Sequence, residues 1–536
     1  HFSPLSGQPK MMTYYTTIAS QLWYNIYVMD NCAGKKQIIK NERIAVALLL
    51  LAGFALRLLL IGSLPYGLNQ DEASAGYDAW ALLNYGIDRC GNSLPVLLES
   101  WGSGQNALMS YLSMPFIALF GLSEFSLRLT NALGGCVALI LFWLLARRAR
   151  GPAFGLCALF FLCVCPWHIM ASRWALESNL LPVFLLAGIT FTAESREKHW
   201  RLLPAAICFG LSLYAYGTAY FFLAPFLVFA VLWLRKSLRL ESFLVSLSVF
   251  TLIALPITLC QLRNALGLPE YTLLGITLPA LTQTRQAATS ILGGGGIDAA
   301  LGNFKAFLGI LFRQYDGLPY NAASTGGLFY FFGLPLAVIG IAESLLHLKK
   351  NPDEAPILAA LGCGFLCALF IDVNINRINM VWLPVIYFIS LGLFVILCKL
   401  KKWSILPVAG VVACFLIFMS GYVSEYGGGG SPYYYPGLGE AIAYVEDQSP
   451  DSVFISYYVN QPYIFTLFYE QIPPDQFIDS VNYVNPSGAF RWVRSFGIYR
   501  FGDAGDARGK YLILHKGEAG DYSLLADFGD FIVCAG

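Results

Sequence analysis

Three carboxylates follow apolar stretches of this chain, in positions where they could carry out chemistry. Asp71 and Glu72 come just after the first long hydrophobic run, and Glu177 follows the third run in the same way. A charged carboxylate is costly at membrane depth, so in a chain this apolar each one needs a partner or a chemical task. Two such sites at one membrane face predict proton abstraction and the positioning of an acceptor.

Each carboxylate also has a structural interpretation. Asp71 and Glu72 would cap a helix, because acidic side chains in a first turn interact favourably with the helix dipole. Arg173 and Glu177 are four residues apart and would form a salt bridge on a continuous helix. The functional interpretation is favoured by the neighbouring residues, since carboxylates among aromatic rings are typical of sugar-binding sites. The same two segments also hold Asp78, Asp88, Glu99, Tyr66, Tyr77, Tyr85, Trp80, Trp101, Trp167 and His168.

A polar connection between two late apolar runs contains Asn376 and Arg377. The guanidinium fork suits a phosphate, which predicts that Arg377 is a phosphate clamp. A pair between Asp372 and Arg377 is the structural alternative. The predicted catalytic residues are Asp71, Glu72 and Glu177, and the predicted substrate-binding residues are Asp88, Arg89, Trp101, His168, Arg173, Asn376 and Arg377.

Composition decides which elements must position these residues. Hydrophobic residues make up 57% of the 536 residues and charged residues only 12%, which is typical of a polytopic membrane protein. The net charge of +1 argues against a nucleic-acid partner. Walker and Rossmann glycine patterns are absent from the sequence, which argues against a nucleotide-linked donor. A sugar on a polyprenyl phosphate is the activated donor that remains.

Apolar segments separated by basic clusters predict an all-α membrane module. We predict eleven spans, at about residues 44–63, 124–146, 152–168, 180–193, 203–217, 219–234, 240–260, 327–346, 355–371, 380–398 and 403–421. The Lys and Arg clusters then all fall on one side, which the positive-inside rule assigns to the cytoplasm. The protein is thus expected in the plasma membrane, with its acidic motifs and C-terminal part on the outer face.

Three parts are expected along the chain. Residues 1–43 form a cytoplasmic tail, of which 1–28 match neither a signal peptide nor a span and are expected to be artefactual. Residues 44–421 form the membrane module, with outer loops at 64–123 and 261–326. The first loop is expected to hold two helices at the membrane interface, and Gly293 to Gly296 to hinge a lid in the second. Residues 422–536 are predicted to form a small α/β domain that supports the site or binds the acceptor.

A set of motifs in this chain resembles the bacterial phospholipid-carrier-dependent glycosyltransferases, relatives of the protein O-mannosyltransferases and of the lipid A aminoarabinose transferase. The resemblance covers about residues 44–400. The motifs are Asp71-Glu72, Gly86-Ile-Asp88-Arg-Cys-Gly91-Asn92-Ser-Leu-Pro95, Gly121-Leu-Ser-Glu-Phe-Ser-Leu-Arg128-Leu, the run from Pro166-Trp-His168 to Glu177-Ser-Asn179, and Asn376-Arg377-Ile-Asn.

This resemblance implies a C-type integral-membrane fold, a polyprenyl-phosphate sugar donor and inversion at the anomeric carbon. It maps the acidic residue of the first outer loop onto Asp71 and that of the second onto Glu177. The phosphate-contacting lysine of the aminoarabinose branch has no counterpart between Glu99 and Tyr111, which leaves the phosphate to Arg89, Arg173 or Arg377. The soluble tail differs from the β-trefoil of eukaryotic O-mannosyltransferases, so the acceptor is open between lipid, glycan and protein.

The expected activity is transfer of a hexose or pentose from the polyprenyl phosphate to an acceptor hydroxyl. Asp71 is the expected general base, Glu177 orients the acceptor, and arginines stabilise the leaving phosphate, with Mg²⁺ or Mn²⁺ as an additional candidate. Two alternatives stay open at this point. One is a polymerase or ligase with a diphosphate-linked glycan donor, and the other is a lipid or sugar flippase.

Overall fold

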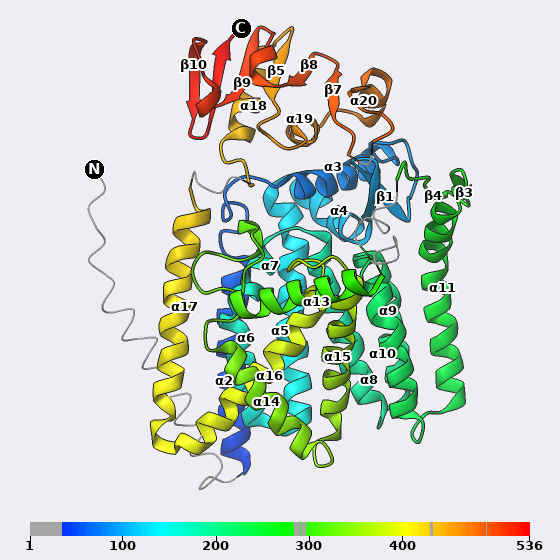
Figure 1. Ribbon diagram of the computed structural model, residues 1–536, viewed down its shortest axis with the longest axis vertical. Helices are drawn as coiled ribbons and strands as arrows, with labels where there is room; N and C mark the ends of the chain where they lie inside the picture. The colour runs from blue at the N-terminus through cyan, green and yellow to red at the C-terminus, as the bar shows by residue number, and fades with distance from the viewer. Residues whose placement is uncertain (1–34, 284–289, 291–295, 429–432, 489) are drawn as a thin grey trace.

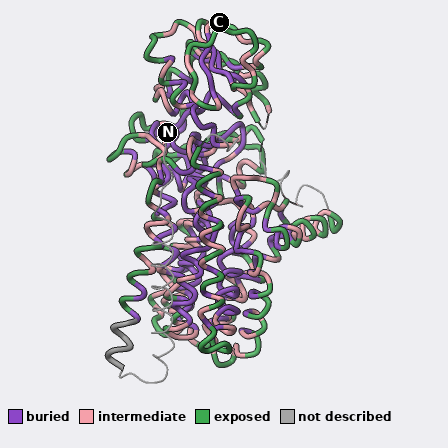
Figure 2. Tube along the Cα trace, turned by 90° about the vertical axis from the view of Figure 1, so that its left-hand side faces the viewer, coloured by how far each residue is buried: buried purple, intermediate pink, exposed green. Residues whose placement is uncertain are grey.

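The computed structural model describes residues 35–283, 290, 296–428, 433–488 and 490–536. A bundle of helices forms the larger part of the molecule, and a smaller domain with the C-terminus covers one end of it (Figure 1). Buried residues fill the interior, whereas exposed residues follow the outer surface (Figure 2). Large apolar side chains such as Leu252 and Leu406 are exposed on the bundle, as expected where helices face lipid.

Each of the eleven predicted spans coincides with a helix of the bundle. These helices are α2 (Lys35–Leu58), α5 (Glu124–Arg150), α6 (Pro152–Val164), α8 (Leu181–Ser195), α9 (Leu202–Ala215), α10 (Ala219–Leu234), α11 (Leu240–Ala265), α14 (Gly333–His347), α15 (Ala355–Phe370), α16 (Trp382–Leu400) and α17 (Ile405–Tyr426).

Fewer of these helices are long and apolar enough to cross a membrane on their own. Within the described residues, four segments meet that criterion: Glu124–Arg150, Leu240–Ala265, Pro352–Phe370 and Asn379–Tyr426. The pair α6 and α7 (Pro166–Arg173), bent by 58°, adds a fifth if it counts as one span. The total of eleven spans therefore stays a prediction.

Basic clusters from separate connections meet at the end of the bundle opposite the C-terminal domain. Arg148 and Arg196 both pair with Asp353, each at 2.9 Å, and Arg150 pairs with Glu354 at 2.5 Å. These contacts join the last turn of α5 to the connections after α8 and before α15. The clusters thus share one end, as the positive-inside argument requires, while the assignment of that end to the cytoplasm stays a prediction.

Close backbone approach joins α14 and α16. A Cβ atom on Gly340 would lie 1.9 Å from the Phe388 carbonyl oxygen, and one on Gly392 would lie 2.0 Å from the Leu336 carbonyl oxygen. Only glycine fits at both contacts, because any side chain would push the two backbones apart. Small residues at helix interfaces serve the same purpose in other membrane bundles.

The first loop forms a layer between the bundle and the C-terminal domain. It contains helix α3 (Gln70–Tyr85), the hairpin β1 (Leu97–Ser100) and β2 (Ser103–Asn106), and helix α4 (Leu108–Phe120). Helix α3 lies across the end of the bundle, directly below the C-terminal domain (Figure 1). The two helices predicted for this loop are α3 and α4.

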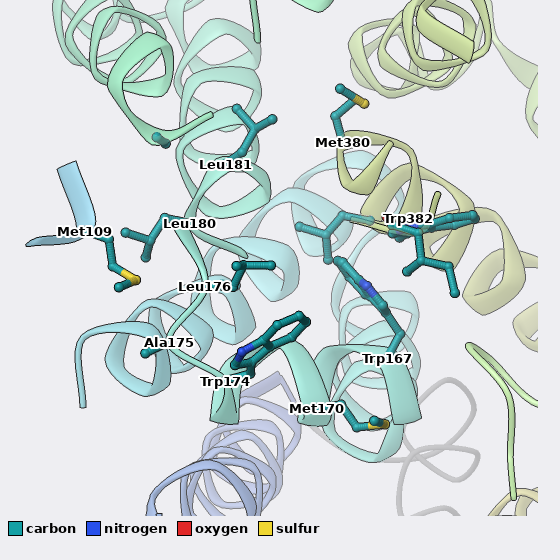
Figure 3. Packing of buried hydrophobic residues seen from close by; sticks show 14 of the residues in the cluster. Met109, Trp167, Met170, Trp174, Ala175, Leu176, Leu180, Leu181, Met380 and Trp382 are labelled. Carbon is teal, nitrogen blue, oxygen red and sulfur yellow. The ribbon is translucent and has the colours of Figure 1, made fainter. Parts of the chain in front are cut away.

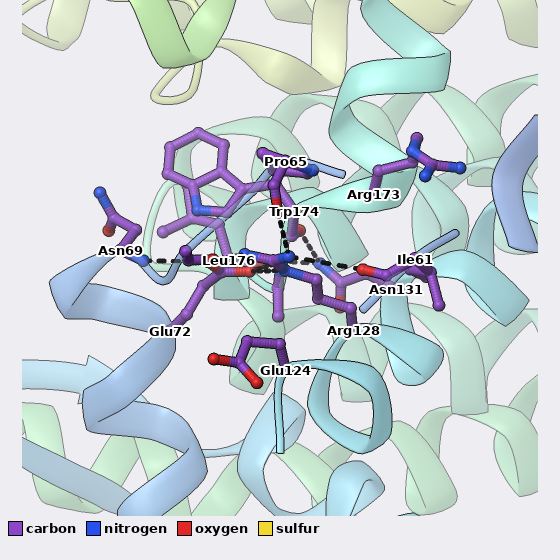
Figure 4. A network of polar contacts seen from close by, with 12 residues as sticks. Ile61, Pro65, Asn69, Glu72, Glu124, Arg128, Asn131, Arg173, Trp174 and Leu176 are labelled. Carbon is purple, nitrogen blue, oxygen red and sulfur yellow. Dashed lines mark hydrogen bonds and ion pairs between the residues drawn. The ribbon is translucent and has the colours of Figure 1, made fainter. Parts of the chain in front are cut away.

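A buried ion pair between Glu72 and Arg128 joins this layer to the bundle (Figure 4). Arg128 donates from Nε and Nη2 to the two carboxylate oxygens of Glu72 at 2.8 and 2.9 Å, and both side chains are fully buried. The guanidinium also donates to the carbonyl oxygens of Pro65 and Gly67, at 2.7 and 2.6 Å. One side chain of α5 thereby holds the chain segment that leads into α3.

The Glu72 carboxylate has two further donors, one on each side of the layer. It accepts the backbone N–H of Asn69 at 3.1 Å, which completes a capping box at the start of α3. It also accepts the backbone N–H of Ala175 at 3.0 Å, which lies between α7 and the short 3₁₀ helix η1 (Glu177–Leu180). Glu72 therefore ties the segment that carries Asp71 to the segment that carries Glu177.

Apolar packing also holds the 174–181 segment in place (Figure 3). Trp174, Leu176 and Leu180 are buried in the same cluster as Trp167 and Trp382. Burying aromatic and leucine side chains of this size stabilises each site by about 1.5–3 kcal/mol. The segment is thus held by apolar burial as well as by hydrogen bonds.

The C-terminal domain is built on a seven-stranded mixed sheet. The strand order is β10-β11-β9-β5-β8-β7-β6, and β5 is parallel to both of its neighbours. Its elements are α18 (Leu438–Glu446), β5 (Val453–Ser456), α19 (Pro462–Glu470), α20 (Pro474–Ser480), β6 (Asn482–Tyr483), β7 (Val493–Phe496), β8 (Tyr499–Gly502), β9 (Tyr511–His515), β10 (Ser523–Phe528) and β11 (Phe531–Ala535). The sequence patterns predict helices near residues 437–447 and 462–470 and strands near 453–458, 511–515 and 531–534. These five elements coincide with α18, α19, β5, β9 and β11.

The second long loop also has structure of its own. A hairpin of β3 (Tyr271–Leu273) and β4 (Ile276–Leu278) contacts the first loop, where Thr277 donates to the Ser93 carbonyl oxygen at 3.2 Å. Helix α13 (Gly296–Arg313) follows and lies across the bundle (Figure 1). Most of the predicted glycine hinge, residues 293–295, lies outside the described residues, so the lid stays a prediction.

Replacing Arg128 with Met should strongly destabilise the protein, because the Glu72 carboxylate would stay buried without its ion pair. Breaking a buried pair in this way costs about 3–5 kcal/mol. Thermal unfolding of the purified protein in detergent measures the effect, and the double variant Arg128→Met, Glu72→Met should recover part of the loss. Lys516→Met, which removes an exposed pair with Asp527, is the control and should unfold close to wild type. An unfolding temperature of Arg128→Met equal to that of wild type would contradict the anchoring role.

Candidate active site

A cavity of about 380 Å³ lies where the bundle, the first loop and the C-terminal domain meet. Its wall combines segments that are far apart in the sequence. They include residues 70–71 of α3, the β1–β2 hairpin, the 174–178 segment, the 216–221 turn, the 371–377 connection, and residues 460, 461 and 490 of the C-terminal domain. A mixed polar and aromatic wall of this kind suits a polar organic ligand.

Half of the predicted site residues line this cavity: Asp71, Trp101, Glu177, Asn376 and Arg377. They come from four separate segments of the chain. Two of the three carboxylates predicted to be catalytic, Asp71 and Glu177, therefore share one cavity with Arg377, whereas Glu72 does not line it. Trp101 adds an aromatic face from the turn of the β1–β2 hairpin.

Asp71 is the second residue of α3, and local hydrogen bonds fix its backbone. Its N–H donates to Asn69 Oδ1 at 3.0 Å, and its carbonyl oxygen accepts from Gln105 Nε2 at 3.5 Å. Burial, with the negative charges of Asp71 and Asp316, raises the pKa of Tyr320 above its ordinary value. Tyr320 also lines the cavity.

Glu177 begins η1, at the end of the segment that the ion pair and Asn131 hold in place. Asn131 Nδ2 donates to the carbonyl oxygens of Trp174 and Leu176 at 2.8 and 2.9 Å. The Glu177 carboxylate accepts the backbone N–H of Asn106 at the end of β2. Because α7 ends at Arg173, the continuous helix that would pair Arg173 with Glu177 is not formed, and that structural alternative is wrong.

The connection with Asn376 and Arg377 is held by residues that the sequence did not single out. Asp316 Oδ2 accepts from the backbone N–H of Ile375 at 2.9 Å and from Asn321 Nδ2 at 2.6 Å. Asn376 Nδ2 donates to Asn321 Oδ1 at 2.5 Å. Arg377 forms an ion pair with Asp372, so the structural alternative for this arginine is realised even though Arg377 also lines the cavity.

Two predicted site residues, Asp88 and Arg89, lie off the cavity wall in a buried network of the first loop. Asp88 Oδ1 accepts the backbone N–H groups of its own turn, at Cys90 and Asn92. Arg89 pairs with Asp78 at 3.4 Å. Burial raises the pKa of Asp78 to about 7, although the charge of Arg89 opposes that shift.

The remaining predicted site residues, Glu72, His168 and Arg173, also have partners within the protein. Glu72 is occupied by Arg128, as described above. His168 Nδ1 lies 2.6 Å from Nη2 of the fully buried Arg57. Arg173 donates to the carbonyl oxygens at the end of α2, including those of Leu56 and Leu59 at 2.9 and 2.8 Å. In this structure these polar groups join helices rather than face the cavity.

Several cavity residues escaped sequence reasoning. The amides of Gln70, Gln105 and Gln461, the ring of Phe490 and Tyr320 all line the wall. Among these residues only Gln70 could have been predicted from the sequence, because it directly precedes Asp71. The others sit in loops whose partners in space cannot be read from spacing.

A metal centre formed by protein ligands is not seen in the part of the chain that the structure describes. Within those residues, His, Cys, Asp and Glu side chains do not gather in groups of three or more that could hold an ion. Asp71 and Glu177 nevertheless give the cavity two carboxylates. Mg²⁺ usually binds through one or two carboxylates together with phosphate oxygens of the substrate.

Comparison with known proteins agrees with the fold. The family profile of dolichyl-phosphate-mannose-protein mannosyltransferases matches residues 107–259, which include Glu177. Among curated protein sequences, none matches this chain.

Two solved structures share the architecture. ArnT from Cupriavidus metallidurans bound to undecaprenyl phosphate has a TM-score of 0.54 at 13% identity, with 94% of this chain and 98% of ArnT covered. The oligosaccharyltransferase AglB from Archaeoglobus fulgidus, in complex with an inhibitory peptide and a dolichol-phosphate, has a TM-score of 0.51 at 13% identity. There the match covers 80% of this chain but 63% of AglB, so this chain spans less than two thirds of that protein.

At 13% identity these likenesses concern the fold, whereas the family profile compares the sequence itself. Both observations agree with the helical bundle described above. Residues 107–259 thus resemble the dolichyl-phosphate-mannose-protein mannosyltransferases in sequence, and the fold of the whole chain resembles that of ArnT.

Proposed function

We propose that this protein transfers a sugar from a polyprenyl-phosphate donor to an acceptor hydroxyl, with inversion at the anomeric carbon. The observation that carries the proposal is the cavity that brings Asp71, Glu177 and Arg377 together at one end of a membrane bundle. The match of residues 107–259 to the mannosyltransferase family profile supports glycosyl transfer as the reaction class. Undecaprenyl phosphate in ArnT and dolichol-phosphate in AglB support a lipid phosphate as the carrier.

In the proposed reaction the acceptor oxygen attacks C1 of the donor sugar while the bond from C1 to the phosphate oxygen breaks. The bonding electrons leave with the polyprenyl phosphate, and the acceptor proton goes to the carboxylate of Asp71. Glu177 orients the acceptor. Arg377 stabilises the charge that develops on the leaving phosphate, where fixed charge in a partly enclosed cavity is most effective.

A divalent cation is an addition to this proposal. Glu177 would hold Mg²⁺ or Mn²⁺ together with phosphate oxygens, in the manner such ions favour. When bound, the ion would neutralise the leaving phosphate. Asp71 keeps the role of proton acceptor in either case.

Glu72 is a positioning residue in this proposal. Its carboxylate is fully buried against Arg128 and contacts the backbone of both segments that carry Asp71 and Glu177. A charge held in that way cannot accept an acceptor proton without breaking the ion pair. The base role is therefore assigned to Asp71 and not to its neighbour.

Asp71→Asn should abolish transfer while leaving donor binding nearly intact, because the amide keeps the shape of the carboxylate but cannot accept a proton. Loss of a general base should slow the chemical step by about 10²- to 10⁴-fold. The assay is single-turnover transfer from undecaprenyl-phosphate sugar at saturating donor, with an undecaprenyl-diphosphate glycan run in parallel. Asp475→Asn is the matched control, since Asp475 is the second residue of α20 and is exposed.

Near-normal turnover by Asp71→Asn would remove Asp71 from the base role and pass it to Glu177. Transfer from the diphosphate glycan in place of the monophosphate would identify the protein as a polymerase or ligase.

Arg377→Ala should weaken donor binding by roughly 10- to 100-fold, since a hydrogen bond to a charged group contributes about 1.5–3 kcal/mol. Asp372→Asn tests the structural alternative, because it releases the arginine from its partner without removing it. If Arg377 binds phosphate, Asp372→Asn should bind undecaprenyl phosphate at least as tightly as wild type. Equal losses of donor affinity in both variants would instead assign Arg377 to its salt bridge.

The C-terminal domain should face the outside of the cell, because the basic clusters gather at the opposite end of the bundle. Cysteine labelling on intact cells checks this, with a single cysteine placed at the exposed Tyr522. A cysteine placed at the exposed Leu346, near the basic end, is the control that should react only after lysis. The reverse pattern would reject both the topology and the proposed location of the site.

A further inference from the structure

Gln461 stands out in the wall of the cavity. It comes from the C-terminal domain, directly before α19, and only 1% of its surface is exposed. Its backbone has φ 58°, in the left-handed region that non-glycine residues rarely adopt. Pro462 follows, and a residue before proline is normally extended. Strained backbone of this kind tends to persist at functional sites, where the surrounding structure enforces it.

Neighbouring contacts hold this turn in place. The N–H of Asn460 donates to Tyr435 Oη at 3.0 Å, and the Gln461 carbonyl oxygen accepts from the Ile464 N–H at 3.2 Å. The Tyr435 ring in turn packs edge-on against Phe465, with ring centroids 5.4 Å apart. The position of the Gln461 side chain is therefore set by the domain before any ligand arrives.

The carboxamide of Gln461 lacks a hydrogen-bond partner on either of its polar atoms, Oε1 and Nε2, within the described part of the protein. A buried polar atom without a partner costs about 1–3 kcal/mol, so most proteins avoid such a group. Gln461 thus has a strained backbone and an unpaired side-chain amide at the cavity wall. Both features are explained if a ligand supplies the missing hydrogen bonds to that amide.

Other unpaired polar atoms surround the same cavity. Trp174 Nε1, Ser178 Oγ and Thr218 Oγ1 are buried there without partners among the described residues, and so is Gln70 Oε1. Trp174, Ser178 and Thr218 belong to the bundle, and Gln70 is the first residue of α3 in the first loop. The aromatic rings of Trp101 and Phe490 also line the wall.

We propose that Gln461 and these four residues of the bundle and the first loop form a subsite for the hydroxyl groups of a sugar ring. This inference rests on the proposed function and names the chemistry that the cavity recognises. Each sugar hydroxyl both donates and accepts, which matches a carboxamide that offers one donor group and one acceptor. Neutral amide and hydroxyl groups suit hydroxyls better than phosphate, which would require cations. Aromatic faces beside them complete the pattern of a carbohydrate site.

The sugar in this subsite belongs either to the donor or to a glycan acceptor. Gln461 lies in the domain that covers the end of the bundle, whereas Arg377 lies on a bundle connection. A glycan acceptor that entered between the two parts would contact Gln461. A donor sugar would reach it from the phosphate held at Arg377. Both sources share one chemistry, and competition between ligands separates them.

The test measures binding of methyl α-D-mannoside, methyl α-D-glucoside and methyl β-D-xyloside to the full chain in detergent, by quenching of tryptophan fluorescence. Gln461→Met keeps the side-chain volume but removes both polar atoms. Gln461→Gly removes the side chain and suits the positive φ. Gln471→Met is the matched control, because Gln471 flanks the other end of α19, has φ 50° and is exposed.

We expect wild type and Gln471→Met to bind at least one glycoside, and both Gln461 variants to bind it at least about 10-fold more weakly. We also expect Gln461→Met to unfold at or above the wild-type temperature without ligand, because it buries no unpaired amide. Unchanged sugar affinity in the Gln461 variants, or no glycoside binding by wild type, would overturn the subsite.

Measuring the affinity for undecaprenyl phosphate distinguishes a failure of the sugar subsite from a failure of the proposed function. This affinity should be the same in wild type and in both Gln461 variants, and a loss confined to that lipid would assign Gln461 to phosphate and overturn the sugar subsite. If wild type binds glycosides through Gln461 but does not bind undecaprenyl phosphate, the sugar subsite stands and the proposed donor is wrong. Displacement of the glycoside by mannosyl-phosphoryl-undecaprenol assigns the subsite to the donor sugar, and simultaneous binding assigns it to the acceptor.

Discussion

The ion pair between Glu72 and Arg128 is the interaction on which the rest of the site depends. The carboxylate and the guanidinium are both fully buried, and the guanidinium also donates to the carbonyl oxygens of Pro65 and Gly67. Buried pairs of this kind contribute little net stability but are very costly to break. The pair therefore works mainly as a geometric constraint, since the chain can satisfy both charges only when the first loop and the 174–177 segment are correctly placed.

The consequence for the cavity is a division of labour between neighbouring residues. Glu72 is directed into the protein and Asp71, one residue earlier, lines the cavity. Ala175, whose backbone N–H donates to Glu72, lies two positions before Glu177, which lines the same cavity. Each carboxylate assigned to chemistry thus lies within two residues of a backbone anchor, which is how a site on irregular loops obtains a fixed geometry.

Several charged side chains in this protein are structural because they donate hydrogen bonds to buried backbone carbonyl groups. Arg173 donates to carbonyl oxygens at the end of α2, and Arg57 donates to the carbonyl oxygens of Gly53 in α2 and Leu162 in α6. Helix ends in an apolar bundle leave carbonyl groups that water cannot reach, so a guanidinium with five donors is an efficient partner. Gln461 of the C-terminal domain differs from these arginines. Both polar atoms of its carboxamide lie at the cavity without a hydrogen-bond partner in the described part of the protein.

The sequence by itself determined the class of the fold, the positions of the bundle helices and half of the C-terminal elements. Hydrophobic run length and alternating patterns are local properties, and helices such as α5 and α16 and the strand β9 follow from them directly. The sequence also indicated Asp71, Glu177 and Arg377 as site candidates, because charged residues that directly follow apolar runs can be recognised from the sequence alone.

What only the tertiary structure decided is which polar residues face the cavity. Glu72, Asp88, Arg89, His168 and Arg173 look as reactive as Asp71 in the sequence, yet each is satisfied by a partner 4 to 117 residues away along the chain. Gln461, hundreds of residues from Asp71, joins the cavity only because the C-terminal domain docks on the bundle. A polar group is available for a ligand when folding leaves it without a protein partner at the cavity wall, and that depends on contacts between distant segments that spacing cannot encode.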